Sequence, residues 1–231
     1  MTSPGSVLPN HGIDADRVLG RESVVTALRR RFNGRYAVDE FGGDPSLMDA
    51  MAPIPSALIR ISVEHEERLP RRGPALLVAN RGFGLFEPFV LGLAVRRVLH
   101  RRLRIVGAPD LPAIGPMARK LGAIGNRPAD VAALLRAGHL AGAPLGNTWM
   151  RAGAGEPPRE LVAATLGFPV IPIAIRPGGP LNLQLRPWKL LVGEPMLPPP
   201  GTEQHDQLAA AELSEQVRTA VQDLLEAQRQ G

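Results

Sequence analysis

Polar residues that could do chemistry follow an apolar run at positions 75–79. The run Ala75-Leu-Leu-Val-Ala79 is typical of a buried strand, and it ends in Asn80, Arg81 and a glycine-rich turn that leads to Glu87. A site at the end of a strand is well placed for chemistry because the sheet holds it rigidly. Arg81 cannot accept a proton, however, because its guanidinium stays charged and has no acceptor atom. The segment therefore looks like an active-site loop in which the catalytic base has been replaced.

The composition indicates one globular unit of 231 residues, of which 44% are apolar. The formal net charge is +5, and arginine dominates because only Lys120 and Lys189 are lysines among the 27 basic residues. Arginine favours phosphate and carboxylate partners, although such usage is equally typical of a GC-rich genome. Cysteine is absent, which excludes disulfides, thiolate metal sites and a cysteine nucleophile. We expect no metal, because zinc-ligand spacing is missing, and no nucleic-acid partner, because only 4% of the residues are aromatic.

Alternating strand and helix patterns from residue 59 onwards predict a mixed α/β fold with a largely parallel central sheet flanked by helices. The chain divides into a flexible leader at 1–20, an N-terminal helical segment at 21–58, a main domain at 59–201 and a C-terminal helix at 202–231 that packs on the domain. The expected strands are 59–63, 74–79, 103–107, 122–125, 139–143, 170–175 and one or two within 181–192. The expected helices are 22–32, 45–58, 86–98, 112–120, 128–137, 157–166 and 206–228.

A cluster of arginines lies at the junction of the expected helix 86–98 and the strand that follows it. Its members are Arg96, Arg97, Arg101, Arg102 and Arg104. We interpret the cluster as a basic edge that attracts anionic lipid headgroups, each charge contributing ~1 kcal/mol. The alternative is a solvated helix end, where the helix dipole favours cations. No apolar stretch reaches the ~20 residues of a membrane span, and no signal peptide is evident. The expected location is the cytoplasm, with peripheral contact at the inner face of the membrane.

Several landmarks along the chain occur in the same order in a known family. They are Gly73-Pro-Ala-Leu-Leu-Val-Ala-Asn80, Leu121-Gly-Ala-Ile-Gly-Asn-Arg127, Pro144-Leu-Gly146, Phe168-Pro-Val-Ile-Pro-Ile-Ala-Ile175 and Val192-Gly-Glu-Pro195. Over about residues 35–200 the chain resembles the glycerolipid or lysophospholipid acyltransferase (PlsC-like) family, in particular its actinobacterial branch. The resemblance implies the glycerol-phosphate acyltransferase-like fold for the main domain.

The resemblance also implies a reaction, the transfer of an acyl chain from a coenzyme A or acyl carrier protein thioester to a glycerol hydroxyl, with no bound cofactor. In the family, a His of the first motif takes the hydroxyl proton, and an acidic residue holds its imidazole. Arg81 stands at the position of that His, and Glu87 is the counterpart of the acidic residue in a loop of different length. Leu145 stands where the third motif has Glu. The implied substrate contacts are Asn80, Gly122, Arg127, Gly146 and Pro172, of which Gly122 and Arg127 would contact the acceptor phosphate.

Two roles are open for Arg81 at this position. In the first, its guanidinium forms a structural, bidentate ion pair with the Glu87 carboxylate and preserves the loop geometry. In the second, Arg81 holds a phosphate, or the pyrophosphate of an acyl donor, at the mouth of the pocket.

We therefore predict a catalytically degenerate family member that binds acyl groups or phospholipid, or that acts as an accessory to a partner protein. The alternative is an active acyltransferase that moves an acyl chain to a lysophospholipid-type hydroxyl with an atypical base. His139 is the candidate for that base, because it precedes the strand that leads to the altered third motif.

Overall fold

The computed structural model describes residues 38–51, 59–81, 86–107, 115–146, 159–178, 187–198 and 206–230, together with residues 25, 26, 29 and 33. The expected leader at 1–20 lies outside the described residues, as do most of the expected helix at 22–32 and the second half of the one at 45–58. The expected strand pattern within 181–186 lies outside them too.

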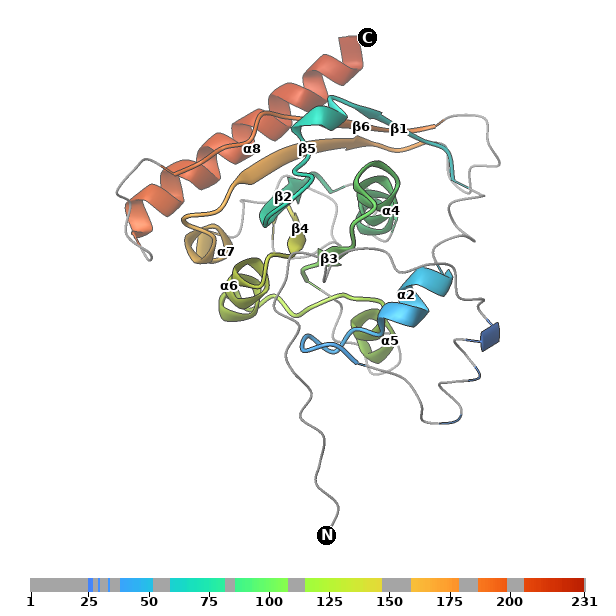
Figure 1. Cartoon of the computed structure of the whole chain (residues 1–231). Helices are drawn as coiled ribbons and strands as arrows, with labels where there is room; N and C mark the ends of the chain where they lie inside the picture. Colours follow the sequence, from blue (N-terminus) through green and yellow to red (C-terminus); the bar gives the residue numbers. More distant parts are fainter. Residues whose placement is uncertain are drawn as a thin grey trace.

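A six-stranded sheet forms the centre of the molecule (Figure 1). Its strands are β1 (Ile61–Glu64), β2 (Ala75–Ala79), β3 (Leu103–Ile105), β4 (Leu140–Pro144), β5 (Val170–Arg176) and β6 (Trp188–Val192), in the order β1-β6-β5-β2-β4-β3. The pairing is parallel everywhere except between β5 and β6. The prediction of a mixed, largely parallel sheet flanked by helices is confirmed.

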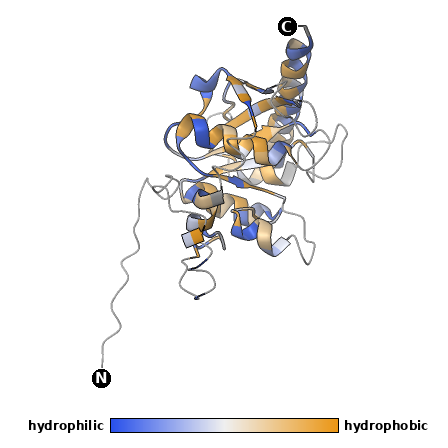
Figure 2. Ribbon diagram, turned by 90° about the vertical axis from the view of Figure 1, so that its right-hand side faces the viewer, coloured by the Kyte–Doolittle hydropathy of each residue, from blue (hydrophilic) through white to orange (hydrophobic). Residues whose placement is uncertain are grey.

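Helices cover both faces of this sheet, and the side chains of β2 alternate between the two layers. Ala75, Leu77 and Ala79 belong to the core beneath α4 (Glu87–Leu99). Leu76 and Val78 belong to the core on the other side. That second core is closed by α6 (Pro128–Arg136), α7 (Arg159–Ala164) and α8 (Gln207–Gln230). A strand buried on both faces must be apolar at every position, which explains the uninterrupted run at 75–79. Figure 2 shows hydrophobic residues on both the strands and the helices of the central part of the molecule.

Helix α4 runs from the end of β2 back to the start of β3. It begins with Glu87 and Pro88, and proline is well accommodated in a first turn because the N–H there has no helical partner. It ends at His100, whose left-handed φ of 54° lets its backbone N–H bond to the Arg96 carbonyl. The amino end of α4 therefore lies at the carboxyl edge of the parallel strands, where β2 ends.

One expected strand is replaced by a single bridge. Residues 122–125 do not form a named strand; instead Ile124 forms an isolated parallel bridge with Val106, just past β3. The Ile124 N–H donates to the Ile105 carbonyl at 2.8 Å, and the Gly107 N–H donates to the Ile124 carbonyl at 3.1 Å. The preceding helix α5 is described over Gly115–Lys120, and the expected start of this helix at 112–114 lies outside the described residues.

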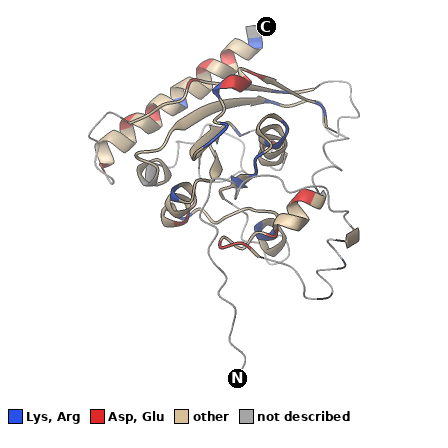
Figure 3. Cartoon of the chain, viewed as in Figure 1, with Lys and Arg blue, Asp and Glu red and all other residues tan. Residues whose placement is uncertain are grey.

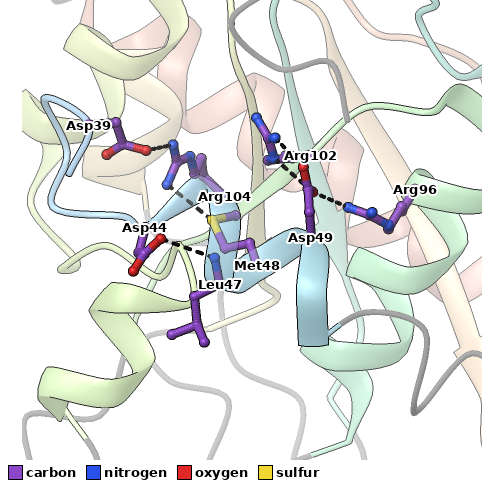
Figure 4. Close-up of polar contacts among 8 residues, drawn as sticks. All are labelled: Asp39, Asp44, Leu47, Met48, Asp49, Arg96, Arg102 and Arg104. Atoms are coloured by element: carbon purple, nitrogen blue, oxygen red, sulfur yellow. Dashed lines mark hydrogen bonds and ion pairs between the residues drawn. The ribbon is translucent and has the colours of Figure 1, made fainter. Parts of the chain in front are cut away.

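Acidic side chains of the segment 38–51, which includes helix α2 (Pro45–Met51), hold it against the β3 edge (Figure 4). The buried Asp49 carboxylate accepts hydrogen bonds from Arg96 Nη1 at 2.6 Å, Arg102 Nη2 at 2.6 Å and Arg102 Nε at 3.2 Å. Asp39 forms an ion pair with Arg104. The Asp49 and Asp39 pairs thus neutralise charge that the apolar interior could not otherwise hold.

The expectation of an exposed basic edge at Arg96–Arg104 is therefore wrong for most of its members. Arg101, Arg102 and Arg104 are 7%, 5% and 2% exposed. Arg101 donates to three backbone carbonyls, those of Pro70, Gly73 and Gly138. Because these guanidinium groups lie inside the protein, they cannot contact lipid headgroups. None of the helices in the described parts of the chain combines the length and the apolar character needed to cross a membrane.

Replacement of Asp49 tests this network. Asp49→Asn leaves the volume unchanged but removes the charge between two guanidinium groups, and we expect the free energy of unfolding in urea to fall by about 3 kcal/mol. Asp223→Asn is the matched control, because Asp223 is exposed on α8, and it should change stability by no more than ~0.5 kcal/mol. Equal stability of the two variants would contradict a structural role for Asp49.

Candidate functional site

Arg81 and Gly146 meet at the carboxyl edge of the sheet, where the neighbouring parallel strands β2 and β4 end. The register pairs Ala79 with Pro144, so both residues follow their strands by two positions. Gly146 is buried and has a φ of 118°, and a Cβ built on it would lie 2.9 Å from Arg81 Cζ and 2.9 Å from Arg81 Nη2. The guanidinium thus lies directly on the backbone of Gly146, so the segments that follow β2 and β4 meet at this edge of the sheet.

Glu87 is the carboxylate that the sequence predicts for this site. It is the first residue of α4 and is only 2% exposed. A carboxylate in the first turn is favoured by the positive end of the helix dipole. An ion pair between Glu87 and Arg81 stays a prediction.

Burial changes the pKa of the Arg81 guanidinium. Its guanidinium is half-buried, and desolvation lowers its pKa below the ordinary value because the charged form is better solvated by water. The group still carries a positive charge at any physiological pH. Chemically it can bind an anion or a carbonyl oxygen, but it cannot remove a proton from a hydroxyl group.

Asn80 acts as a backbone substitute between β2 and β5. Its Nδ2 donates to the Ile175 carbonyl at 2.9 Å, and its Oδ1 accepts from the Ile175 N–H at 2.5 Å. The side-chain amide thereby extends the β2–β5 ladder past the end of β2. Asn80 was expected to contact substrate, but in this structure both polar atoms of its side chain bond to the backbone of β5.

The space beside Gly122, the glycine of the expected second motif, is occupied by side chains of the protein itself. Gly122 is buried with a φ of 89°, and a Cβ there would lie 2.6 Å from Met48 Cε and 3.2 Å from Arg104 Nη1. Arg127, by contrast, is exposed at the N-cap position of α6. The parallel bridge between Val106 and Ile124 lies just past the carboxyl end of β3, and Arg127 follows it by three residues. Arg127 is therefore on the carboxyl side of the sheet, as Arg81 is, with β4 and β3 between the bridge and β2. The two arginines share an edge without touching.

Pro172 and Leu145 both serve packing. Pro172 lies opposite Val78, and its carbonyl accepts the Gly193 N–H at 2.8 Å. Leu145 is 6% exposed and belongs to the core beneath α6, α7 and α8. The position at which the resemblance implies a glutamate is therefore occupied by a core side chain.

His139 is at the other end of the strands. It precedes Leu140, which pairs with Ala75 at the start of β2, so about seven residues of strand, or roughly 23 Å, separate it from the level of Arg81. The ring is 4% exposed and packs edge-on against Phe41, with centroids 5.5 Å apart. The structure does not bring the proposed alternative base to the Arg81 loop.

Two aromatic side chains beside Glu87 were missed in the sequence. Phe86 and Phe89 are 54% and 42% exposed at the start of α4. The signal was their position, since the core residues of this helix are Val90, Leu91, Ala94 and Val95 and both phenylalanines precede that stripe.

Comparisons with known proteins find relatives of the chain in mycobacteria. No family model matches it. It is 31% identical to the uncharacterized proteins Rv0502 of Mycobacterium tuberculosis and Mb0514 of Mycobacterium bovis, over 88% of this chain and 72% of each relative. The chain belongs to the family of these proteins. The uncharacterized protein ML2427 of Mycobacterium leprae is 29% identical, over 88% of this chain and 71% of that relative.

The alignments also show a difference in internal length within this family. The aligned region spans 259 positions, more than the 231 residues of the chain, so the relatives carry internal residues without a counterpart here. Among solved structures, the chain is similar to the 1-acyl-sn-glycerophosphate acyltransferase PlsC from Thermotoga maritima. The TM-score is 0.49 at 15% identity, over 83% of this chain and 86% of that one.

The role of Asn80 can be tested by removing one or both of its bonds. Asn80→Ala leaves the N–H and the carbonyl of Ile175 without partners, and we expect a loss of about 2 kcal/mol in unfolding free energy. Asn80→Asp keeps the acceptor but places a second oxygen against the Ile175 carbonyl, so it should be at least as destabilising. Gln216→Ala, on the exposed side of α8, is the control. An Asn80→Ala protein as stable as this control would contradict the scaffold role.

The contact between Arg81 and Gly146 can be measured by a double-mutant cycle. Gly146→Ala introduces both a strained φ and a clash with Arg81, whereas Gly73→Ala introduces only the strain, because nothing lies within 4 Å of its Cβ position. We therefore expect Gly146→Ala to be the more destabilising change in urea. Adding Arg81→Ala should recover about 1 kcal/mol, the coupling typical of touching residues. Purely additive effects would show that the two residues do not touch.

Proposed function

We propose that this chain is a catalytically degenerate member of the PlsC-like acyltransferase family that binds an acyl group or a phospholipid, or supports a partner enzyme. The observation that carries the proposal is the guanidinium of Arg81, seated on Gly146 at the carboxyl edge of the sheet. Ligands of parallel sheets bind at this edge, so the residue stands where substrate would be handled.

Acyl transfer to a hydroxyl needs a proton acceptor, and the described residues near Arg81 offer no imidazole. His139 and His100 lie at the opposite end of the strands and of α4, and His65 is exposed in a turn where its ring faces Glu67 at 3.4 Å. Replacing a general base costs ~10²- to 10⁴-fold in rate. An active enzyme would have to depend on positioning alone.

The altered third motif supports the same proposal. A carboxylate at position 145 would have to enter the apolar core in which Leu145 lies, unless the chain turned differently after β4. Arg81 and Gly146 remain able to hold an anionic or carbonyl oxygen at the strand ends. Binding without turnover is the function that this arrangement supports best.

Acyl transfer can be followed by thiol release from acyl-coenzyme A with lysophosphatidic acid as the acceptor. The chain has no cysteine, so a thiol reagent reads only the coenzyme A that is set free. We expect the native protein to stay at the no-protein background. Arg81→His should rise above that background because it restores a proton acceptor, whereas Arg81→Lys should not.

Turnover by the native protein that is lost in Arg81→Ala would overturn the degenerate assignment. Arg136→Ala, at the far end of α6, is the control for a general loss of positive charge. Retention of radiolabelled lysophosphatidic acid or acyl-coenzyme A in equilibrium dialysis would provide the binding readout.

A further inference from the structure

Three turns meet at the amino edge of the sheet, the edge opposite to Arg81. They precede the neighbouring strands β2, β4 and β3, and all of their residues belong to the described part of the chain. Arg101, in the turn before β3, joins the other two. Its Nη1 donates to the Pro70 carbonyl at 3.1 Å and the Gly73 carbonyl at 2.8 Å, and its Nη2 donates to the Gly138 carbonyl at 2.9 Å. One buried guanidinium therefore holds the three turns together as a unit.

Three exposed arginines project from these turns. Arg71 and Arg72 lie between the two residues before β2 whose carbonyls Arg101 binds, and Arg136 lies two residues before Gly138. Arg136 is in the last turn of α6, where the helix dipole favours a cation. The dipole does not account for Arg71 and Arg72, which are on no helix. We call Arg71, Arg72 and Arg136 the arginine surface.

Acidic residues offset little of this charge. Exposed Glu40 borders the arginine surface, because the ring of neighbouring Phe41 packs on the histidine that precedes β4. The acidic helix η1 (Glu66–Arg68) lies farther away, at the end of β6, where Arg68 donates to the Val192 carbonyl at 2.8 Å. Strand β5 separates β6 from β2. Positive charge therefore predominates on the arginine surface.

The composition of the surface indicates the kind of partner that it fits. Guanidinium groups bind carboxylates and phosphates through paired hydrogen bonds. None of the large exposed hydrophobic side chains in the described residues belongs to these three turns. The surface thus offers no apolar anchor for a lipid interface and no aromatic ring on which a nucleic-acid base could stack. The carboxylates of an acidic protein segment are the remaining match.

A second copy of this chain could also offer carboxylates, from helix α8. The exposed acidic residues of α8 include Glu212, Asp223 and Glu226. Figure 3 shows red segments along this helix. Cations are interspersed with them, however, and Arg218 Nε donates to Glu215 at 2.8 Å. A contact between α8 and the arginine surface of another copy would also join two different faces, which generates open chains unless the rotation closes a ring. A separate protein is therefore the better match.

We propose that the arginine surface docks a segment of a partner protein that is rich in aspartate and glutamate. The proposal rests on the accessory part of the proposed function and specifies where the partner binds. A partner at the amino edge leaves Arg81, at the carboxyl edge, open. The two proposals are tested separately, since peptide binding requires no acyl transfer and the transfer assay contains no peptide.

The experiment is fluorescence anisotropy of a labelled glutamate decapeptide titrated with the full chain. Binding should be saturable and should weaken with added salt, because exposed charges are screened. A glutamine decapeptide should not bind. The triple variant Arg71→Ala, Arg72→Ala, Arg136→Ala should weaken binding of the glutamate peptide by about tenfold, since each exposed ion pair contributes a small factor.

A matched triple variant controls for net charge. Arg60→Ala, Arg119→Ala, Arg229→Ala removes the same charge from exposed positions outside the three turns and should change the affinity by no more than about twofold. Replacement of all three arginines of the arginine surface by glutamate should abolish binding of the glutamate peptide and create binding of a lysine decapeptide. Unfolding midpoints should agree among these proteins, because all altered side chains are exposed.

Four outcomes would overturn the proposal. The first two are absence of binding to the glutamate peptide and equal losses in the two alanine triple variants. The third is tighter binding of single-stranded RNA, or of vesicles that contain phosphatidylglycerol, that only the test variant loses. The fourth is a molecular mass that rises with protein concentration unless the arginine surface is removed, which would make it a contact between copies of this chain. None of these outcomes changes the acyl-transfer result at Arg81.

Discussion

The burial of β2 on both faces is the constraint on which the rest of the structure depends. Five consecutive residues lie between α4 on one side and α6, α7 and α8 on the other, so none of them can carry a polar side chain without an internal partner. Polar chemistry is therefore confined to the residues that follow the strand. Asn80 and Arg81 are the first positions at which it becomes possible, and the fold places the amino end of α4 beside them.

A second constraint is that buried positive charge at the β3 edge must be neutralised. Arg102 immediately precedes β3 and Arg104 lies within it, and each is neutralised by an aspartate of the segment 38–51. Such pairs contribute little net stability when both partners are compared with apolar residues, but they strongly penalise the loss of either one. The two ion pairs consequently fix the position in which the segment 38–51, with helix α2, packs against the β3 edge. They also remove these arginines from the surface that a partner could meet.

The sequence predicted structure well where the spacing of apolar residues indicates which faces are buried. It did not predict the environment of charged residues, because charge alone does not indicate burial. The apolar run at 75–79 and the core stripe of α4 predicted their elements closely, because periodicity follows directly from which faces are covered. The arginines at 96–104 could not be interpreted in the same way. Their partners Asp39 and Asp49 lie about fifty residues or more away in the chain, and nothing local in the sequence signals that pairing. The contact between Arg81 and Gly146 is likewise a product of parallel strand register, since each motif alone gives no distance to the other.

Asn80 shows that the fold alone can require a particular polar residue at the end of a strand. Because its amide replaces a peptide group in the β2–β5 ladder, selection for folding alone would keep asparagine at this position. The same holds for Gly146, where any larger residue would collide with Arg81. In a lineage that had lost its proton acceptor, these residues would still be maintained. The residues that still resemble an active site would then be those that folding requires. The position of the former histidine, which folding does not require, would be the first to be substituted.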